Sequence, residues 1–325
     1  MTTEPTAKHP WTAADPCPPE LAARLIHDQF RDLSDKDVVP IGAGWDNEAY
    51  RCDDWIFRFP KKADALSRHR LEARVMPRIA AQLSIPVTVP ERFGAPDHGY
   101  PHPFQGHRMV PGRPIVADPD VAISEDFAAI LGRELRALHS VPVEDALALG
   151  VPTEPLDSLI AMYRSGARSR RERLEPHLPA ELLTALSRVL DDDRRFTISS
   201  PESPVLTHSD LHEEHILVDP ASGRPSGIID WSDLSIVDPA VDFVGLRHWR
   251  GAAFAEAVLE ARGLPLVDPQ SFQDRLETMT ICVAAIVTDY GLHGDRPDCL
   301  TLGRRALERE LGLLEPRSDP EPAAG

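Results

Sequence analysis

The sequence predicts an α+β fold with two lobes, a small strand-rich lobe followed by a larger, mainly helical one. Three observations support this prediction. Short apolar runs with hairpin turns between them fill residues 38–110. Amphipathic helical patterns dominate after Ser124. Between these stretches, Pro111-Gly112-Arg113-Pro114 breaks both patterns, which is typical of a connection between lobes.

The small lobe, placed at residues 1–106, is expected to combine a sheet with two helices. Pro18-Pro19-Glu20 marks the start of the first helix, because proline suits the first helical turn. A second helix is expected over residues 64–83, with Glu72 on its apolar side, where a carboxylate needs a partner. Strands are expected at Val38–Ile41, Ala49–Cys52, Trp55–Phe59, Glu91–Phe93 and Gln105–Val110.

The hinge is placed at residues 107–112 and the large lobe at residues 113–325. An apolar stripe that ends near His139 predicts a helix, and charged helices are expected over 155–195. A short β segment then interrupts the helical pattern. Its strands are expected at Val205–Thr207, Ile216–Val218 and Gly227–Trp231.

Composition limits the function classes. The 325 residues carry a net charge of -17, which argues against nucleic acid as a partner, since phosphate backbones select basic surfaces. No apolar run is long enough to span a membrane, and the polar start has no signal-peptide pattern. The four cysteines are scattered and form no C-x-x-C pair. We therefore expect reduced thiols, a cytoplasmic location and a monomer.

One polar stretch carries the chemistry. His208-Ser209-Asp210-Leu211-His212-Glu213-Glu214-His215 lies between two apolar strands, and a hairpin then leads to Asp230. Such a hairpin brings His215 close to Asp230, with Asp210 on the loop before them. Phosphoryl transfer needs one carboxylate near the hydroxyl proton and further groups that hold magnesium between the phosphates. The spacing H-x-D-x-x-x-x-ligand, followed by an aspartate, matches the catalytic loop and metal aspartate of kinases.

The same stretch resembles the aminoglycoside and macrolide antibiotic phosphotransferases, which share the protein-kinase fold. Ile229-Asp230-Trp231 and Asp238-Pro239-Ala240-Val241-Asp242 match their metal motif and the D-P-x-x-D that follows it. The macrolide 2'-phosphotransferases look more similar than the aminoglycoside enzymes. They also carry a histidine at the position of His215, and their strand tract resembles Trp55–Lys62. The resemblance covers residues 20–300, patchily over 145–200.

The resemblance implies roles for single residues. Asp210 matches the catalytic aspartate, and His215 and Asp230 match the Mg²⁺ positions. Arg58 matches the strand cation that reaches the phosphates of ATP or GTP, and Glu72 matches the helix carboxylate that orients it. The hinge Gln105–Gly112, with Met109 and Val110, matches the segment that binds the nucleotide base. Residues of a partial G-x-G-x-x-G motif, Gly42, Gly44 and Asn47, are expected in the phosphate loop.

Three departures from the family pattern stand out. Serine replaces the usual glycine at position 209, and no chemical need for glycine is evident there. His215 is a poorer ligand for Mg²⁺ than asparagine, because this ion prefers oxygen. Asn47 stands in for the last glycine of the loop motif, which also contains Trp45.

Two other classes remain open. A zinc hydrolase site is conceivable from His208, Asp210, His212 and His215, although His212-Glu213-Glu214-His215 lacks the H-E-x-x-H spacing. A non-catalytic kinase-like binding protein is the second alternative. Retention of both Asp210 and Asp230 speaks against it, since a silent site has no chemical need for either.

The expected substrate is a small-molecule antibiotic phosphorylated on a hydroxyl, with a macrolide first, an aminoglycoside second and a metabolic small molecule third. An apolar pocket suits a macrolide, whereas an aminoglycoside needs many carboxylates. A candidate helix over residues 279–291 is mainly apolar and ends on Asp289 and Tyr290. Asp233 is a further candidate. Other residues considered for the pocket are Trp249, Ile281, Val283, Ile286, Val287 and Asp295.

Overall fold

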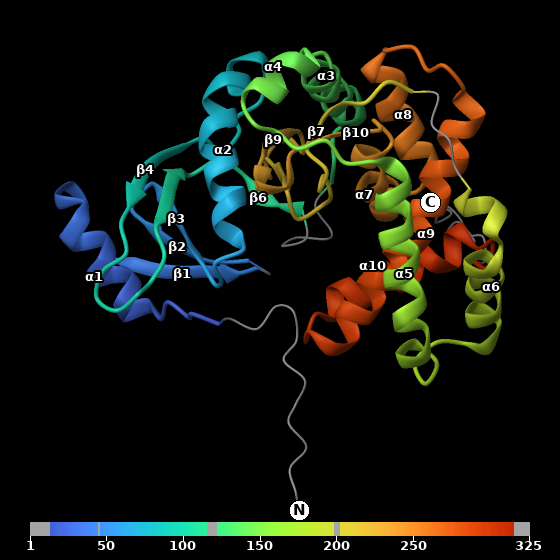
Figure 1. Cartoon of the computed structure of the whole chain (residues 1–325), viewed down its shortest axis with the longest axis horizontal. Helices are drawn as coiled ribbons and strands as arrows, with labels where there is room; N and C mark the ends of the chain where they lie inside the picture. Colours follow the sequence, from blue (N-terminus) through green and yellow to red (C-terminus); the bar gives the residue numbers. More distant parts are fainter. Residues whose placement is uncertain (1–13, 45, 116–121, 198–201, 315–325) are drawn as a thin grey trace, which may run out of the picture.

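The computed structural model describes residues 14–44, 46–115, 122–197 and 202–314. A small sheet-containing lobe lies beside a larger helical lobe, as Figure 1 shows. The expected two-lobed, protein-kinase-like α+β architecture is confirmed. Trp45, part of the expected phosphate loop, falls outside the described residues.

The small lobe is built on one antiparallel sheet with the strand order β1-β2-β3-β5-β4. The aromatic side chains of β3, Trp55, Phe57 and Phe59, are buried on one face against the first helix. This alternation sends Arg58 to the opposite face, as the sequence predicts. The elements are α1 (Pro19–Gln29), β1 (Val38–Ala43), β2 (Asn47–Cys52), β3 (Trp55–Pro60), α2 (Ala65–Ile79), β4 (Pro90–Gly94) and β5 (Phe104–Arg108).

Helix α2 connects the two lobes. It lies across the boundary in Figure 1, and its Val75 and Met76 pack into the same core as the short strands of the large lobe. Val87, between α2 and β4, also forms a bridge with Ile228. The lobes therefore share apolar packing next to the predicted site, which limits how far they separate there.

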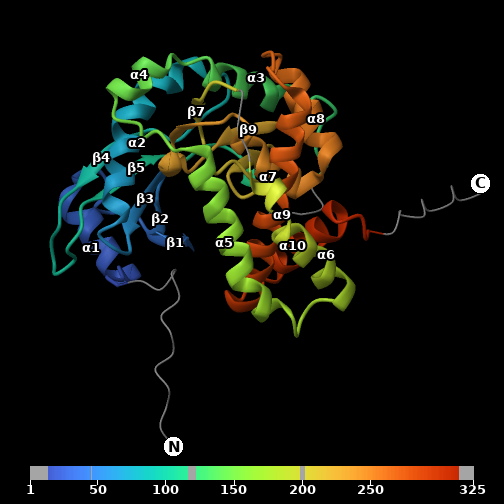
Figure 2. The same cartoon turned by 45° about the vertical axis from the view of Figure 1, so that its right-hand side comes forward.

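The large lobe surrounds two small sheets with helices, as seen after a 45° turn in Figure 2. Strand β7 pairs with β10, and β8 lies between β6 and β9. The elements are β6 (Arg113–Pro114), α3 (Phe127–His139), α4 (Val143–Ala148), α5 (Leu156–Leu174), α6 (Ala180–Asp191), β7 (Val205–Thr207), β8 (Ile216–Val218), β9 (Pro225–Ile228), β10 (Ser235–Val237), α7 (Val241–Arg250), α8 (Ala252–Arg262), α9 (Pro269–His293) and α10 (Pro297–Glu310). Short 3₁₀ turns lie at Arg31–Leu33, Ala80–Gln82, Asp193–Phe196 and Trp231–Asp233.

Two predicted strands end earlier than expected. The strand predicted to reach Val110 ends at Arg108, and the strand predicted to reach Trp231 ends at Ile228. In the second case the reason is visible in the backbone. Asp230 has a φ of 60°, in the left-handed region, and a residue in that conformation leaves the sheet ladder. The functional aspartate thus lies after the strand, at the start of a 3₁₀ turn.

The candidate substrate helix turns out to have two different faces. It is the C-terminal half of α9, and Ile281, Cys282, Ala284 and Ala285 on one face are buried in the core. Val283, Ile286 and Val287 on the other face are only half-buried. Both interpretations of this apolar run, core and pocket wall, therefore apply, each to one side of the helix.

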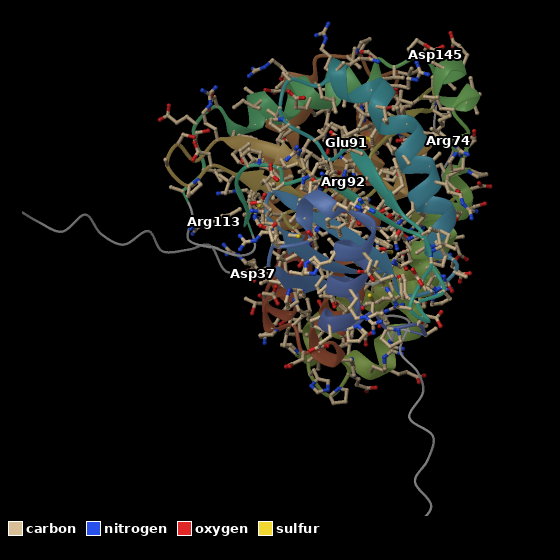
Figure 3. All side chains as sticks on the ribbon, turned by 90° about the vertical axis from the view of Figure 1, so that its left-hand side faces the viewer. Asp37, Arg74, Glu91, Arg92, Arg113 and Asp145 are labelled. Carbon is tan, nitrogen blue, oxygen red and sulfur yellow. The ribbon has the colours of Figure 1, made fainter. Side chains whose placement is uncertain are left out.

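Charged side chains cover the outer face of the small lobe, as Figure 3 shows for Glu91 and Arg92 of β4. The Arg92 guanidinium lies 4.2 Å from the ring centre of Trp55 and bonds to Asp32. Its charge therefore stays solvated while its flat face shields the aromatic ring. None of the helices in the described part of the chain combines the length and apolarity of a bilayer crossing. All four cysteines are free and buried.

A glycine contact between α3 and α8 yields a test of the packing. A Cβ added at Gly132 would collide with the Ala261 side chain and lie 2.6 Å from the carbonyl oxygen of Val258. We expect Gly132→Ala to lower the free energy of unfolding by about 1–3 kcal/mol, because overpacking outweighs the helix propensity of alanine. Urea denaturation measures this. Gly42→Ala is the matched control, since nothing lies within 4 Å of an added Cβ there. Equal stability of both variants would contradict the close approach.

Candidate active site

The polar loop of residues 208–215 runs from β7 to β8, and Asp242 of α7 holds its backbone from the buried side. This buried carboxylate accepts hydrogen bonds from the backbone amides of His208, at 3.1 Å, and Ser209, at 2.8 Å. It also accepts one from Nε2 of His139, at 2.9 Å. The D-P-x-x-D motif thus gains a physical role, because its last aspartate holds the loop backbone in place.

The backbone of Ser209 explains the usual glycine at this position. Its φ is 68°, in the left-handed region, which glycine adopts more easily than other residues. The sequence showed no chemical need for glycine here, and the structure adds a backbone reason for it. The Ser209 hydroxyl bonds to the hydroxyls of Thr207 and Ser235, both at 2.7 Å. These hydrogen bonds stabilise the left-handed backbone conformation of Ser209, which costs free energy in any residue that has a Cβ.

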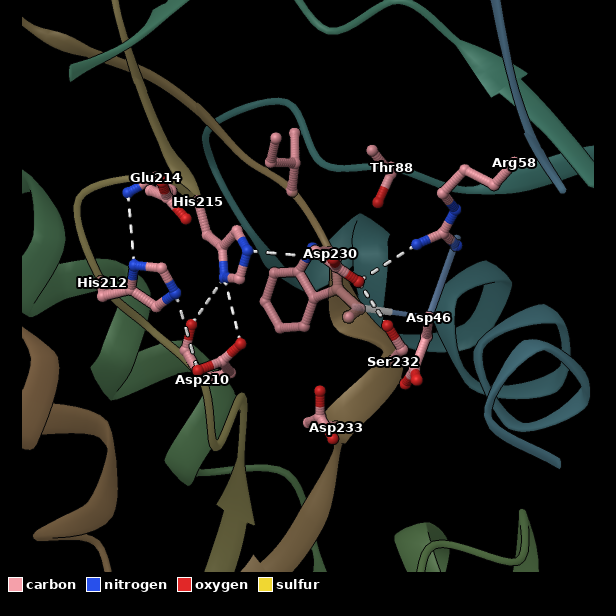
Figure 4. A network of polar contacts seen from close by, with 12 residues as sticks. Asp46, Arg58, Thr88, Asp210, His212, Glu214, His215, Asp230, Ser232 and Asp233 are labelled. Carbon is pink, nitrogen blue, oxygen red and sulfur yellow. Dashed lines mark hydrogen bonds and ion pairs between the residues drawn. The ribbon is translucent and has the colours of Figure 1, made fainter. Parts of the chain in front are cut away.

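Asp210 lies on this loop and lines a cleft between the lobes. Figure 4 shows its contacts with His212 and His215. Its side chain is 46% exposed, and its oxygens lie 3.6 Å from Nε2 of His212 and 3.5 Å from Nδ1 of His215. Desolvation opposes ionisation of Asp210, but the neighbouring imidazoles, His212 foremost, outweigh it and hold the pKa of this carboxyl below its usual range. Asp210 is therefore ionised at neutral pH and ready to accept a hydrogen bond from a hydroxyl.

His212, which the sequence suggested only as a possible zinc ligand, is the other histidine next to Asp210. Burial lowers the pKa of its imidazole, but the Asp210 carboxylate more than compensates and raises that pKa to about 10. The two side chains thus form an ion pair within the loop. A signal was present in the sequence, since a histidine two residues after a loop aspartate lies within reach of it.

His215 and Asp230 come together as the hairpin predicts. Nδ1 of His215 lies 2.7 Å from the Asp210 carbonyl oxygen, so that nitrogen carries the proton and donates it. The other ring nitrogen, Nε2, is left with its lone pair and lies 3.8 Å from Oδ2 of Asp230. A nitrogen and a carboxylate oxygen therefore face each other in an arrangement suited to a cation between them.

Asp230 is also the point where the small lobe meets the site. Its Oδ1 accepts a hydrogen bond from Nη1 of Arg58, at 3.1 Å, and one from the Ser232 hydroxyl. Burial tends to raise the pKa of Asp230, but the charge of Arg58 outweighs it and lowers that pKa to about 2. Asp230 is thus a carboxylate over the whole physiological range, as a hard-cation ligand must be.

Arg58 and Glu72 form the buried ion pair that the sequence predicts. Nη2 of Arg58 bonds to Glu72, which is fully buried and also accepts a hydrogen bond from Gln105 at 2.9 Å. Burial of two charges is tolerated because each is paired and hydrogen-bonded. Arg58 thereby links β3, α2 and the segment after β9.

The phosphate-loop candidates line the same cleft in part. Gly44 and Asn47 belong to the lining, and no atom lies within 4 Å of a Cβ added at Gly42 or Gly44. Nζ of Lys61 bonds to the Gly44 carbonyl at 2.6 Å, and Asn47 bonds to His69 at 2.7 Å. The loop therefore leaves open space on the side where phosphates are expected.

The hinge candidates occupy different environments. The backbone amide of Met109 donates to the carbonyl of Asp54 at 2.8 Å, and the Met109 side chain is exposed. Val110 is buried, and its side chain lies against Gly227 of β9. The Met109 amide is thus already engaged, so a nucleotide base would have to use other backbone groups of this segment.

The cleft encloses about 1180 Å³ and continues past Asp210 toward α5 and α9. Asp233 and Tyr290 line it, as expected for substrate-binding residues, and apolar side chains of α5 and α9 face them. Asp289 is absent from the lining in the described part of the chain. Its two oxygens bond to Arg173 at 2.8 and 2.6 Å, so this carboxylate is committed to an ion pair. The apolar wall is formed by Leu159, Met162, Val283, Ile286 and Val287.

One observation in the structure favours the zinc interpretation and another speaks against it. Ligand atoms of Asp210, His212 and His215 all lie within 4.8 Å of one another. Residues 212–215 form a turn, not the helix that H-E-x-x-H requires. The same three residues are also explained without zinc, since both rings contact Asp210.

A two-lobed kinase-like fold, a loop carboxylate, a strand cation and a second aspartate together define a phosphotransferase class of site. Residues 37–274 match the phosphotransferase enzyme family, and since this is more than half of the chain, the chain belongs to that family. The resemblance predicted from the sequence is thus confirmed.

Curated relatives are similar over part of their length. The aminoglycoside 3'-phosphotransferase of Streptomyces fradiae is 29% identical over 47% of this chain and 62% of that protein. The viomycin phosphotransferase of Streptomyces vinaceus is 26% identical, over 48% and 52% respectively. The uncharacterized protein YcbJ of Bacillus subtilis (strain 168) is 26% identical, over 58% and 61%. The chain therefore spans 52–62% of the length of these three relatives.

Solved structures extend the likeness to nearly the whole chain. The GDP and kanamycin complex of APH(2'')-IIIa is 26% identical with a TM-score of 0.72, covering 90% of this chain and 98% of that one. The macrolide 2'-phosphotransferase MphH from Brachybacterium faecium is 23% identical with a TM-score of 0.55, covering 89% and 97%. At that identity the second likeness shows the fold alone.

The environment of Asp233 predicts a pH-dependent stability. Burial, and next the charge of Asp210, raises the pKa of Asp233 to about 6. Because the folded pKa lies above the ordinary value, the folded protein binds more protons between about pH 4 and pH 6, and the ionised carboxylate costs stability above that window. We expect the stability gain of Asp233→Asn over wild type to grow from about pH 4 to about pH 7.

Urea denaturation at several pH values measures this trend. Asp192→Asn is the control with the opposite sign, since a hydrogen bond from Arg194 lowers the pKa of Asp192. Removal of that carboxylate should cost stability near neutral pH and cost less as the pH falls through the folded pKa. A pH-independent effect of Asp233→Asn would contradict the raised pKa of this carboxyl.

Proposed function

We propose that the chain is an antibiotic phosphotransferase that moves the terminal phosphoryl group of ATP or GTP to a hydroxyl of its acceptor. The observation that carries the proposal is the convergence of Asp210, Asp230 and Arg58 at one cleft. These groups come from three separate parts of the chain, and all three line the same cleft.

Asp210 receives the proton in this proposal. The acceptor oxygen forms a bond to the terminal phosphorus, the bond from that phosphorus to the bridging oxygen breaks, and the diphosphate leaves with the electron pair. The hydroxyl proton passes to the Asp210 carboxylate. Because the pKa of Asp210 lies below its usual range, this carboxylate orients the hydroxyl first and takes the proton late, when the oxygen is already bonding to phosphorus.

The donor set beside Asp210 fits a magnesium ion through Asp230, with His215 next to it. Asp230 supplies an ionised oxygen, and His215 directs Nε2 toward it with the proton held on Nδ1. When bound, the ion neutralises charge on the donor phosphates. Arg58 remains tied to Glu72 and Asp230, so it sets the position of the carboxylate from the small-lobe side.

A macrolide is the first candidate acceptor. The wall of α5 and α9 that faces Asp210 is largely apolar, and Asp289 is paired with Arg173 and does not line the cleft. A large apolar ring fits such a wall better than a compact polycation does. Besides Asp210 and Asp230, the lining carries the carboxylates of Asp46, Glu154, Glu213, Glu214 and Asp233, one of which would face the single amine.

An aminoglycoside is the second candidate, and a different observation favours it. The kanamycin complex of APH(2'')-IIIa is the more similar structure of the two described above, and an aminoglycoside 3'-phosphotransferase is among the curated relatives. A nucleotide-consumption panel separates the two. It pairs ATP and GTP with erythromycin-like and kanamycin-like acceptors, plain sugars and amino alcohols.

We expect phosphorylation of the macrolide with at least tenfold higher kcat/KM than of the aminoglycoside. In Asp210→Ala, kcat should fall by about 10²–10⁴ while nucleotide binding stays intact. Glu91→Ala, on the distant outer face of the small lobe, is the matched control and should match wild type.

Turnover of the aminoglycoside alone would overturn the macrolide assignment. Turnover of only a sugar or amino alcohol would place the enzyme in metabolism, and no turnover with nucleotide bound would favour a binding protein.

The two metal candidates should respond differently to substitution. We expect Asp230→Asn to weaken magnesium-nucleotide binding and turnover more than His215→Asn, because a carboxylate is the stronger ligand for a hard cation. His215→Asn restores an oxygen ligand and should be tolerated or mildly activating. Isothermal titration with magnesium and a non-hydrolysable nucleotide, together with steady-state rates, measures both effects.

Metal analysis of the purified protein is the accompanying control. Stoichiometric zinc, or a His215→Asn protein that is dead while Asp230→Asn is nearly normal, would contradict the magnesium assignment. Either result would favour a zinc site formed by Asp210, His212 and His215.

A further inference from the structure

A second charged link between the lobes lies one helical turn before Glu72. Arg68 of α2 directs Nη1 to Oδ2 of Asp46, at 2.5 Å, and to Oδ1 of Asp233, at 3.3 Å. Asp46 belongs to the turn between β1 and β2, the candidate phosphate loop, and Asp233 ends the 3₁₀ turn that begins after Asp230. One guanidinium thus joins the tip of the loop to the metal segment.

All three side chains line the central cleft. Figure 4 shows Asp46 and Asp233 close to Asp230 and Ser232, within the same polar network. Asp46 is also paired with Lys62 at 2.9 Å, so its carboxylate is held by two cations. The side chain of Arg68 itself is 47% exposed. A solvent-accessible cation is therefore fixed at the centre of the site by two carboxylates from opposite lobes.

The donors of the two arginines are used very differently. Arg58 is buried, with Nη1 on Asp230 and Nη2 on Glu72, so it has little left to offer a ligand. Arg68 makes both of its contacts through Nη1. Within the described ranges, its Nε and Nη2 form no hydrogen bond with the protein. A planar guanidinium with a fixed position and unused donors suits recognition of a phosphate.

The charge balance of the cleft also calls for a further cation. Asp46, Asp210, Asp230 and Asp233 all line the space in which the proposed triphosphate lies. A polyanionic ligand next to these carboxylates needs positive charge beyond a buried arginine that is already paired twice. Among the described lining residues, Arg68 stands between two of the four carboxylates and is open to the cleft.

We propose that Arg68 binds the terminal phosphate of the nucleotide donor, with Asp46 and Asp233 holding its guanidinium in place. This inference rests on the proposed phosphotransferase function and adds a residue to it that the family resemblance does not supply. Within the nucleotide, Arg68 would contact only the phosphoryl group that is transferred. Its contribution to nucleotide affinity would therefore disappear once the donor has become a diphosphate. That property separates phosphate binding from a merely structural link between the lobes.

The test compares a non-hydrolysable triphosphate analogue with the corresponding diphosphate, each with magnesium, by isothermal titration. We expect Arg68→Ala to raise the Kd of the triphosphate analogue at least tenfold and to change the Kd of the diphosphate less than twofold. Arg68→Lys keeps one charge without the planar donors and should give an intermediate loss. Arg70→Ala is the matched control, because Arg70 is an exposed arginine on the same helix. Thermal melting checks that each variant is folded.

Each outcome decides one question. Equal losses for triphosphate and diphosphate would show a structural link and overturn the proposal, as would wild-type affinity of Arg68→Ala for both ligands. A wild-type protein that binds neither nucleotide would instead overturn the phosphotransferase function itself. Selective loss of the triphosphate analogue in Arg68→Ala, with Arg70→Ala unchanged, is the result that supports the assignment.

Discussion

The buried contact of Arg58 with Glu72 and Asp230 is the interaction on which the site depends. It joins a strand and a helix of the small lobe to the turn after β9 in the large lobe. A lone charge at any of these positions would be expensive to bury, so the three groups are stable only together. The position of the Asp230 carboxylate and the polar contact between the lobes at this point therefore follow from one constraint.

The second constraint acts on the backbone. Asp210 is useful only if the loop holds it at the end of the cleft, and Asp242 fixes two successive amides of that loop from the buried side. Ser209 and Asp230 both take left-handed conformations next to the reacting groups. Such conformations cost free energy unless hydrogen bonds support them, and here hydroxyl contacts at Ser209 and the Arg58 contact at Asp230 supply that support.

The sequence predicted the site where spacing alone determines position. Alternation along β3 separates Arg58 from its aromatic neighbours, and the hairpin between β8 and β9 brings His215 to Asp230. What the sequence did not show depends on tertiary pairing. Asp289 looked like a free acid at a helix end, but Arg173 from α5 takes both its oxygens. Arg68 was not among the candidates, because its two partners lie on other elements of the chain. Long-range ion pairs carry no local pattern, so no periodicity predicts them.

The proposed reaction places two opposing electrostatic requirements on the cleft. A triphosphate and an ionised Asp210 repel each other, yet transfer requires them to meet at one hydroxyl oxygen. The structure resolves this by placing cations around the reacting point and apolar side chains beyond it. Arg58 and Arg68 lie on the small-lobe side, and His212 lies beside Asp210. Past Asp210 the wall of α5 and α9 becomes largely apolar, whereas the arginines of the lining come from the small lobe. Under the proposed function, the α5–α9 wall therefore governs the choice of acceptor, while Asp210, Asp230 and the neighbouring cations govern the chemistry.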